Sequence, residues 1–166
     1  MIANILHHRG GRQRLIDHLR LLSDSDRVRR FGCEMTDEQL VQWVAGLVAS
    51  RDAALCVLSH HDGRIRAAMV LQPYLRNSRA ECEASLTVSP DARRQGLGMR
   101  LAAAALDWAR GQSIRNLRFA VDSTNFPMLA MARKLGAEAG LAGGWSLSVP
   151  VAVELSETQR MVGRFG

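Results

Sequence analysis

A strand, a polar loop and a helix follow one another directly in the middle of this chain. Polar and apolar side chains alternate from Ala80 to Val88, which is typical of a strand whose two faces meet different surroundings. A helix is expected from about Gly98 to Arg110, because apolar side chains recur there at helical spacing. This succession of elements is characteristic of mixed α/β domains.

The loop between these two elements suits a bound phosphate and reads Arg93-Arg94-Gln95-Gly96-Leu97-Gly98. Backbone N–H groups are unpaired at a helix start, the helix dipole adds partial positive charge, and glycines let phosphate oxygens approach. A P-loop is excluded because the loop lacks Gly-Lys followed by Ser or Thr, and a dinucleotide fingerprint because Leu101 replaces its third glycine. An ordinary glycine-containing turn before a helix is the remaining alternative.

The other predicted elements place helices first, an antiparallel meander next, and alternating strands and helices last. A capping box, Thr36 with Gln39 three residues later, predicts a helix that runs to about Ser50. Asn125 offers an N-cap for a late helix that Gly136 is expected to end. The remaining predictions are helices at 12–22 and 24–31 and strands at 2–6, 53–59, 65–71 and 117–121, followed by two strands within 137–155.

Length and composition indicate one well-packed domain spanning residues 1–166. Hydrophobic residues make up 47% of the chain, which is enough for a core, and the net charge is +6. Almost all of the positive charge is arginine, since Lys134 is the only lysine, and arginine favours bidentate contacts to phosphate or carboxylate. A nucleic-acid-binding domain is the charge-based alternative, but aromatic residues make up only 5% and no nucleic-acid-binding motif is recognised.

The cysteine, histidine and hydropathy patterns predict a cytoplasmic protein without a metal centre. Cys33, Cys56 and Cys82 are odd in number and lack metal-site spacing, so we expect buried thiols in a reducing compartment. The histidine pairs at 7–8 and 60–61 are neighbours rather than ligand-spaced clusters. No apolar run is long enough for a signal peptide or a membrane span, so no membrane partner is expected.

Two segments of the chain resemble the GNAT family of N-acyltransferases, whose loop signature is Arg or Gln, two residues, Gly, one residue, then Gly or Ala. Arg93, Gly96 and Gly98 fit that signature completely. The segment from Asn125 to Ala137 is similar to the family's Asn-led helix that ends in Lys-Leu-Gly. The resemblance covers about 53–137, and its motifs look most like bacterial protein-lysine acetyltransferase domains linked to acyl-CoA synthetases.

This resemblance implies an α/β (α+β) GNAT fold, with a mixed, mostly antiparallel twisted sheet of six to seven strands, helices on both faces and a splayed central strand pair. It also implies acetyl-CoA as the acyl donor, without a metal. The pantetheine arm is expected in the splay beside Leu86, Thr87 and Val88, with Asn125 as a polar contact as well as an N-cap. The pyrophosphate is expected around Arg93, Arg94, Gln95, Gly96, Leu97, Gly98 and Met99.

The activity implied by the resemblance is transfer of an acetyl group from acetyl-CoA to a primary amine, by direct attack in a ternary complex. A lysine-like amine with a pKa of ~10.4 must lose a proton near neutral pH, and Glu83 fits the family's base position best. Glu81, on the same face of the strand, is the second choice, and two solvated carboxylates are the alternative. The family's usual acidic tyrosine is absent because Ala132 stands at its position, which leaves Ser123 or water as weak substitutes.

The missing tyrosine keeps a second class of function open, a catalytically silent acyl-CoA-binding sensor. The acceptor amine is not specified: protein lysines, N-terminal amines, polyamines, antibiotics and small metabolites all fit, and so do a monomer and a homodimer. In the segment 24–31, Arg27, Arg29 and Arg30 form either a solvated helical face or a site for an acidic substrate. Trp43 lies on an apolar helical stripe, so it is expected in the core.

Overall fold

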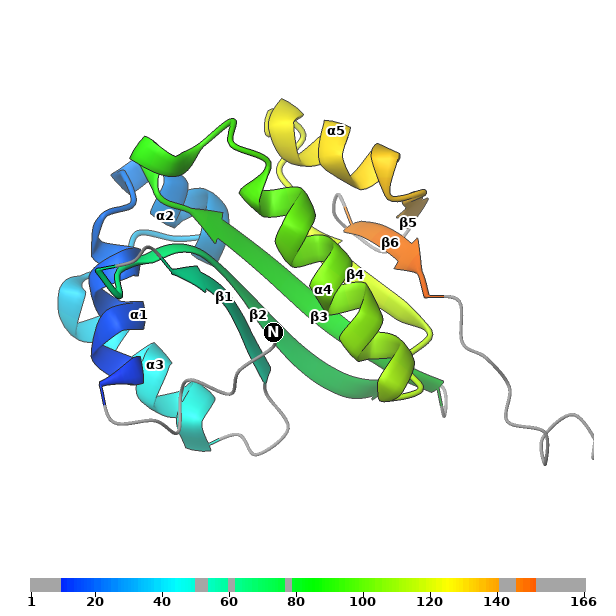
Figure 1. The fold of residues 1–166 in the computed structure, drawn as a ribbon, viewed down its shortest axis with the longest axis horizontal. Coiled ribbons are helices and arrows are strands. Elements are labelled where there is room, and N and C mark those ends of the chain that lie inside the picture. Colours follow the sequence, from blue (N-terminus) through cyan, green and yellow to red (C-terminus); the bar gives the residue numbers. More distant parts are fainter. Residues whose placement is uncertain (1–9, 50–53, 60–61, 77–78, 141–145, 152–166) are drawn as a thin grey trace, which may run out of the picture.

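The computed structural model describes residues 10–49, 54–59, 62–76, 79–140 and 146–151, which form helices around one six-stranded sheet (Figure 1). The strands follow the spatial order β1-β2-β3-β4-β6-β5. Their bounds are β1 Ala54–Ser59, β2 Ile65–Arg76, β3 Arg79–Val88, β4 Asn116–Ala120, β5 Glu138–Gly140 and β6 Ser146–Pro150. The helices are α1 Gly11–Arg20, α2 Asp24–Phe31, α3 Asp37–Ala49, α4 Leu97–Gly111 and α5 Phe126–Lys134, and a 3₁₀ turn, Pro90–Ala92, precedes α4.

The sheet is mixed and mostly antiparallel, as the sequence predicted. Among the described strands, only β3 and β4 pair in parallel, whereas β1 with β2, β2 with β3, β4 with β6 and β5 with β6 pair antiparallel. The two strands expected after residue 137 are β5 and β6, and β6 is inserted between β4 and β5. The strand predicted at 2–6 lies outside the described residues.

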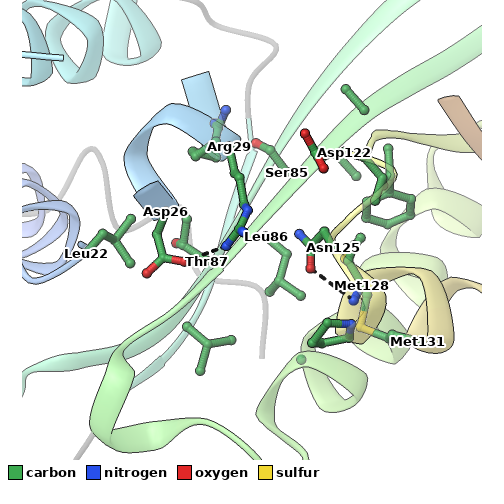
Figure 2. A pocket seen from close by; sticks show the side chains of 18 of the residues that line it. Leu22, Asp26, Arg29, Ser85, Leu86, Thr87, Asp122, Asn125, Met128 and Met131 are labelled. Atoms are coloured by element: carbon green, nitrogen blue, oxygen red, sulfur yellow. Dashed lines mark hydrogen bonds and ion pairs between the residues drawn. The ribbon is translucent and has the colours of Figure 1, made fainter. Parts of the chain in front are cut away.

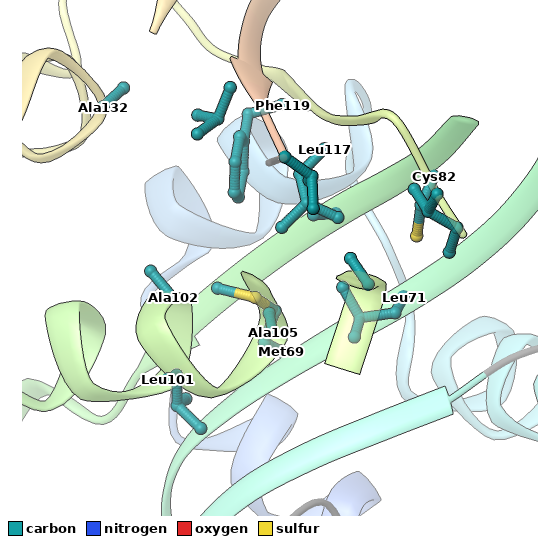
Figure 3. Packing of buried hydrophobic residues seen from close by; sticks show 14 of the residues in the cluster. Met69, Leu71, Cys82, Leu101, Ala102, Ala105, Leu117, Phe119 and Ala132 are labelled. Atoms are coloured by element: carbon teal, nitrogen blue, oxygen red, sulfur yellow. The ribbon is translucent and has the colours of Figure 1, made fainter. Parts of the chain in front are cut away.

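Helices cover both faces of the sheet, and the alternating side chains of β2 contribute to both resulting cores. Met69 and Leu71 belong to a buried cluster with α4 and α5, whereas Ala68 and Val70 belong to a cluster with α1 and α3. Figure 3 shows part of the first cluster, in which alanines of α4 lie near Phe119 of β4. Because both faces of β2 are buried, a register slip of one residue would exchange the two sets of side chains and is strongly disfavoured.

The central pair β3–β4 separates after a short paired stretch. All of β3 pairs with β2, but β4 pairs only with residues 81–83 of β3. The Ser89 N–H donates to the Arg66 carbonyl oxygen at 2.9 Å, so odd-numbered residues of β3 direct their backbone groups toward β2. The backbone groups of Leu86 and Val88 therefore face the open edge, which confirms the expected splay.

β2 continues past its predicted end at residue 71 and reaches Arg76. Pro73 lies in this extension, and its missing N–H is tolerated because the described part of β1 pairs with β2 only as far as Leu71. Proline argues against a central strand in a sequence taken alone. The second half of β2 is therefore identified only by its pairing with β3 in the structure.

Local signals predicted the helix ends well. The Gln39 N–H donates to Thr36 Oγ1 at 3.3 Å and the Thr36 N–H donates to Gln39 Oε1 at 2.8 Å, which is the expected capping box. Gly136 follows α5 with φ of 76°, a left-handed conformation that favours glycine. These ends depend on contacts within a few residues, so they could be deduced from short stretches of sequence.

Cys82 is buried as expected, but Cys33 is exposed, so the expectation of buried thiols is wrong for Cys33. It follows Gly32, the left-handed residue that ends α2, and lies in the bend before α3. Within the described ranges, no helix has both the length and the apolar character needed to cross a bilayer.

Candidate active site

A large cleft lies where β3 and β4 separate, and its volume is about 1330 Å³. Its walls come from the end of β3, the loop after it, the first turns of α4 and α5, and α2. Figure 2 shows Leu86 near the middle, with Asp26 and Arg29 of α2 on one side and Asn125 and Met128 on the other. Ligand pockets usually measure roughly 300–1,000 Å³, so this cleft suits an extended ligand or two ligands together.

The first turn of α4 presents unpaired backbone donors to the cleft. Gly96 precedes the helix with φ of 74°, and no side chain of the described residues caps it. The Arg100 N–H donates to the Gly96 carbonyl oxygen at 3.1 Å and so makes the first helical bond. The N–H groups of Leu97, Gly98 and Met99 therefore have no acceptor within the helix, and all three residues line the cleft. This arrangement fits an anionic group.

The side chains of Arg93 and Gln95 are engaged away from that helix start. Arg93 Nη2 lies 2.6 Å from Asp26 Oδ2 on α2, and Gln95 Nε2 donates to the Asp91 carbonyl oxygen at 3.1 Å. Gln95 does not line the cleft, whereas Arg94 lines it and is exposed. Arg94 is therefore the better placed of the two loop arginines to offer its charge to an anion.

The Arg93–Asp26 ion pair links the loop to α2, across 67 positions of sequence. Burial opposes the charged form of Asp26, but hydrogen bonds from Ser23 and Arg93 outweigh it and hold the pKa of Asp26 below its usual value. The Asp26 carboxylate is therefore charged near neutral pH. The pair fixes one wall of the cleft to the loop that precedes α4.

Gly98 allows α4 to approach β3 and α5 closely. A Cβ atom at this position would lie 3.2 Å from Leu86 Cδ2 and 3.3 Å from Met131 Sδ, both tighter than ordinary van der Waals contact. Leu86 and Met131 both line the cleft, so the missing side chain of Gly98 helps to set the shape of the cavity. The second glycine of the loop signature thus has a packing reason, whereas Gly96 has a conformational one.

Replacing Gly98 by Val is expected to lower the free energy of unfolding by about 1–3 kcal/mol, because three added carbon atoms must displace Leu86 and Met131. Gly46 of α3 is the matched control, since a Cβ there would meet nothing within 4 Å. Urea denaturation measures the free energy of unfolding of Gly98→Val and of Gly46→Val. Equal stabilities of the two variants would contradict the packing role of Gly98.

A buried histidine braces the end of β3 beside the cleft. His18 of α1 is 1% exposed, and its Nε2 lies 2.8 Å from Thr87 Oγ1. Its Nδ1 lies 3.1 Å from both the Ile65 carbonyl oxygen and Ser89 Oγ. A neutral ring satisfies this network, because Nδ1–H donates to the carbonyl and Nε2 accepts from the Thr87 hydroxyl. Burial lowers the pKa of His18 to about 4, and the bond to Ile65 offsets only part of that effect.

The three predicted pantetheine residues differ in what they offer the cleft. Thr87 lines it, but the His18 ring engages its side chain and β2 engages its backbone. Leu86 and Val88 also line the cleft, and their backbone groups face the open edge of β3. Of these three residues, Leu86 and Val88 are therefore the ones whose backbone N–H and C=O groups can bind a ligand in the cleft.

Of the two candidate bases, Glu83 lines the cleft and Glu81 does not. Glu81 is 6% exposed and accepts hydrogen bonds from the Tyr74 hydroxyl at 2.9 Å and from Arg118 of β4. Its carboxylate therefore braces β3 against β4 where the two strands are still paired. Glu83 is exposed to the cleft, and its charge acts on the guanidinium of Arg30.

Asn125 caps α5 and also lines the cleft, so both of its expected roles are compatible with its position. Its Oδ1 accepts a hydrogen bond from the Met128 N–H at 3.3 Å.

Ala132 is 0% exposed in the core of the same helix, and Ser123 does not line the cleft. Ser85, which the sequence analysis did not single out, contributes a hydroxyl to the cleft from β3.

α2 and α3 add residues that were not among the predicted site residues, although Arg29 and Arg30 were considered as a site for an acidic substrate. Arg29, Arg30, Phe31 and Trp43 all line the cleft, and Trp43 also packs against the core of α1 and α3. The three arginines of α2 were visible as a cluster. Which of them faces the cleft depends on how α2 packs against β3, and no local pattern encodes that.

Comparison with known proteins agrees with this geometry. Residues 16–137 match the model of the acetyltransferase (GNAT) family. Among curated proteins, none matches the chain in sequence.

Solved structures share the fold at low sequence identity. The GNAT domain of the S. lividans protein PAT is 17% identical, with a TM-score of 0.71 and 84% of each chain covered. A GNAT-family acetyltransferase from Streptococcus pneumoniae is 14% identical, with a TM-score of 0.66, covering 92% of this chain and 98% of the other. One from Staphylococcus aureus is 12% identical, with a TM-score of 0.68, covering 88% of this chain and 96% of the other.

The family match spans most of the chain and includes the loop signature, the splayed strands and the Asn-led helix. The structural similarity to the GNAT domain of S. lividans PAT covers 84% of the chain. The chain therefore belongs to the acetyltransferase (GNAT) family.

Proposed function

We propose that this chain is an N-acetyltransferase that transfers an acetyl group from acetyl-CoA to a primary amine, by direct attack within a ternary complex. The main observation in its favour is the open edge of β3, where Leu86 and Val88 direct backbone groups into the cleft beside the start of α4. We take residues 1–166 as a single catalytic domain.

Acetyl-CoA fits the chemistry of the residues that line the cleft. The N–H groups of Leu97, Gly98 and Met99 and the guanidinium of Arg94 would hold its phosphates. The backbone groups of Leu86 and Val88 would pair with the amides of its pantetheine arm, in the manner of an added strand. Asn125 is a further polar contact at the start of α5.

The proposed catalytic residue is Glu83. The bound acetyl donor supplies a thioester, and the acceptor nitrogen forms a bond to its carbonyl carbon as the carbon–sulfur bond breaks. The amine must lose a proton, and the Glu83 carboxylate lines the cleft where it can accept that proton directly or through water. The thiol of the donor, with a pKa of about 8.5, leaves as a thiolate with little help, so a tyrosine is not required.

A catalytically silent acyl-CoA-binding sensor is the alternative function. It is favoured by Ala132, which is buried in the core and offers no acidic group to the cleft. The two functions make the same prediction for cofactor binding and opposite predictions for turnover.

Binding of acetyl-CoA is expected to raise the melting temperature by about 5–10 °C at a hundredfold excess over its Kd. A panel of amines, followed by thiol release and by the mass of the product, then tests transfer. Acetylation of any amine supports the enzyme. Binding without turnover on the whole panel would favour the sensor, and absence of binding would contradict both.

We also propose a cytoplasmic setting. The thiols of Cys33 and Cys82 are free, and Cys33 is exposed, which favours a reducing compartment.

A further inference from the structure

The wall of the cleft opposite α5 carries a stacked arginine. Arg30 lies in the last turn of α2, and its guanidinium carbon is 4.8 Å from the centroid of the Phe31 ring and 4.9 Å from that of the Trp43 ring. The two rings are themselves in edge-to-face contact, with centroids 5.2 Å apart and an interplanar angle of 79°. Arg30 therefore lies against two aromatic rings that hold its side chain in one place.

This stacking leaves the edge of the guanidinium available. Among the described residues, no hydrogen bond and no ion pair within 4 Å engages Arg30, whereas Arg93 on the same cleft is paired with Asp26 at 2.6 Å. The N–H donors of a guanidinium lie in its plane, so contacts to aromatic rings do not consume them. A planar fork of this kind matches a carboxylate with two parallel hydrogen bonds.

The group remains a cation under physiological conditions. Burial lowers the pKa of Arg30 to about 10, and the charge of Glu83 acts in the opposite direction. A half-buried positive charge that lacks an ion-paired partner gains more from a ligand carboxylate than an exposed one does, because less water screens the interaction. Arg30 is thus better suited to binding an anion than an ordinary surface arginine.

Glu83 lies on the same wall of the cleft and within electrostatic reach of Arg30. The two side chains come from different elements, β3 and α2, and both line the cleft beyond the open edge of β3. A neighbouring pair of a carboxylate and a guanidinium complements a molecule that carries an amine and a carboxylate a few atoms apart.

We propose that the acceptor is an amino acid, whose carboxylate pairs with the guanidinium of Arg30 while its amine lies toward Glu83. This inference rests on the proposed acetyl transfer and names the class of its acceptor. A lysine side chain within a protein carries no carboxylate close to its amine, so it would leave Arg30 without a partner. Arg30 is then a residue that determines specificity rather than one that takes part in proton transfer.

Amino acids and their carboxamides separate this acceptor from a simple amine. The nineteen standard L-amino acids with a primary amine and the matching amino-acid amides differ in the charge next to that amine. We expect kcat/KM for the preferred amino acid to exceed that for its amide by about 10- to 100-fold, the usual worth of a charge-assisted bond. In Arg30→Met, which keeps an apolar side chain against the rings, the preference should fall to within about twofold.

Two further variants control the experiment. Arg110→Gln removes a positive charge from the far end of α4, where Arg110 pairs with Asp107, and should keep the full preference for the acid. Arg30→Lys keeps the charge but loses the planar fork, so an intermediate preference is expected. The acetyl-CoA thermal shift of each variant shows whether the cofactor half of the cleft is intact. If Arg30→Met does not fold, the acid-over-amide preference of Arg30→Lys tests the role of Arg30.

The outcomes distinguish this inference from the proposed function. Equal use of acids and amides by the unmodified protein, or an acid preference that survives in Arg30→Met, would overturn the role of Arg30 and leave acetyl transfer standing. Efficient acetylation of a lysine peptide without acidic residues would also overturn it. If no amine is acetylated, the proposed function fails, and thermal shifts with the same acids and amides still show whether Arg30 binds a carboxylate.

Discussion

Replacing Glu83 by Gln is expected to lower kcat for acetyl transfer by about 10²- to 10⁴-fold near neutral pH, because general-base catalysis contributes a factor of that size. Glu83 is exposed to the cleft, and glutamine keeps the shape of its side chain while removing the ability to accept a proton. The loss should become smaller as the pH rises toward the pKa of the acceptor amine, since a growing fraction of the amine is then already neutral. The pH profile of kcat measures this, and the Kd for acetyl-CoA should stay unchanged.

Glu81→Gln is the matched control for this experiment. Glu81 is two residues away on the same face of β3, but its carboxylate pairs with Arg118 and accepts a bond from Tyr74 outside the cleft. Its replacement is expected to lower the free energy of unfolding and to leave the shape of the pH profile intact. Full activity of Glu83→Gln, or a loss of the pH dependence in Glu81→Gln, would show that the base has been assigned to the wrong carboxylate.

The protein is expected to lose about 3 kcal/mol of stability between pH 7 and pH 4 through His18 alone. Burial lowers the pKa of His18 from 6.5 to about 4 in the folded state. Between these two values the unfolded chain binds a proton that the folded protein excludes, so stability is complete above pH 6.5 and falls as the pH drops toward 4. The free energy of unfolding in urea, measured from pH 7.5 to pH 4, tests this dependence.

His18→Gln isolates this contribution from that of the carboxylates. Glutamine can still donate or accept one hydrogen bond to Thr87 or Ile65, but it does not titrate. The variant is expected to be less stable than the unmodified protein at pH 7, with a difference that shrinks as the pH approaches 4. A difference that stays constant over this range would mean that the buried ring is not the titrating group.

Much of the fold could be read from local patterns. Alternation predicted the third strand with its two faces, and the capping box at Thr36 and the N-cap at Asn125 predicted the starts of two helices. Proline at position 73 concealed the second half of β2, because its effect depends on which edge of the strand is paired. The order of the sheet, with β6 between β4 and β5, was not predicted from the sequence and is known only from the structure.

The candidate site, like the fold, was predictable from the sequence only in part. The loop signature located the start of α4 and its backbone donors, but the direction of the Arg93 side chain toward Asp26 was not visible. Glu83 and Glu81 lie on the same face in the alternation of β3, and the family resemblance favoured Glu83. The neighbouring strand adds a structural reason, since Arg118 engages Glu81 and not Glu83.

By itself the sequence determined the strand, loop and helix at the end of the cleft where we propose that an anion binds. The left-handed conformation at Gly96 is a local property that the residue type favours, whereas the close packing of Gly98 against Leu86 and Met131 depends on the tertiary structure. Only the tertiary structure decided which side chains come together along the wall of the cleft formed by α2 and β3. His18 reaches Thr87 across 69 positions of sequence, and Arg30 meets Trp43 and Glu83 only because α2, α3 and β3 pack together. Such encounters depend on how elements distant in sequence dock, which is a property of the whole core and not of any local pattern.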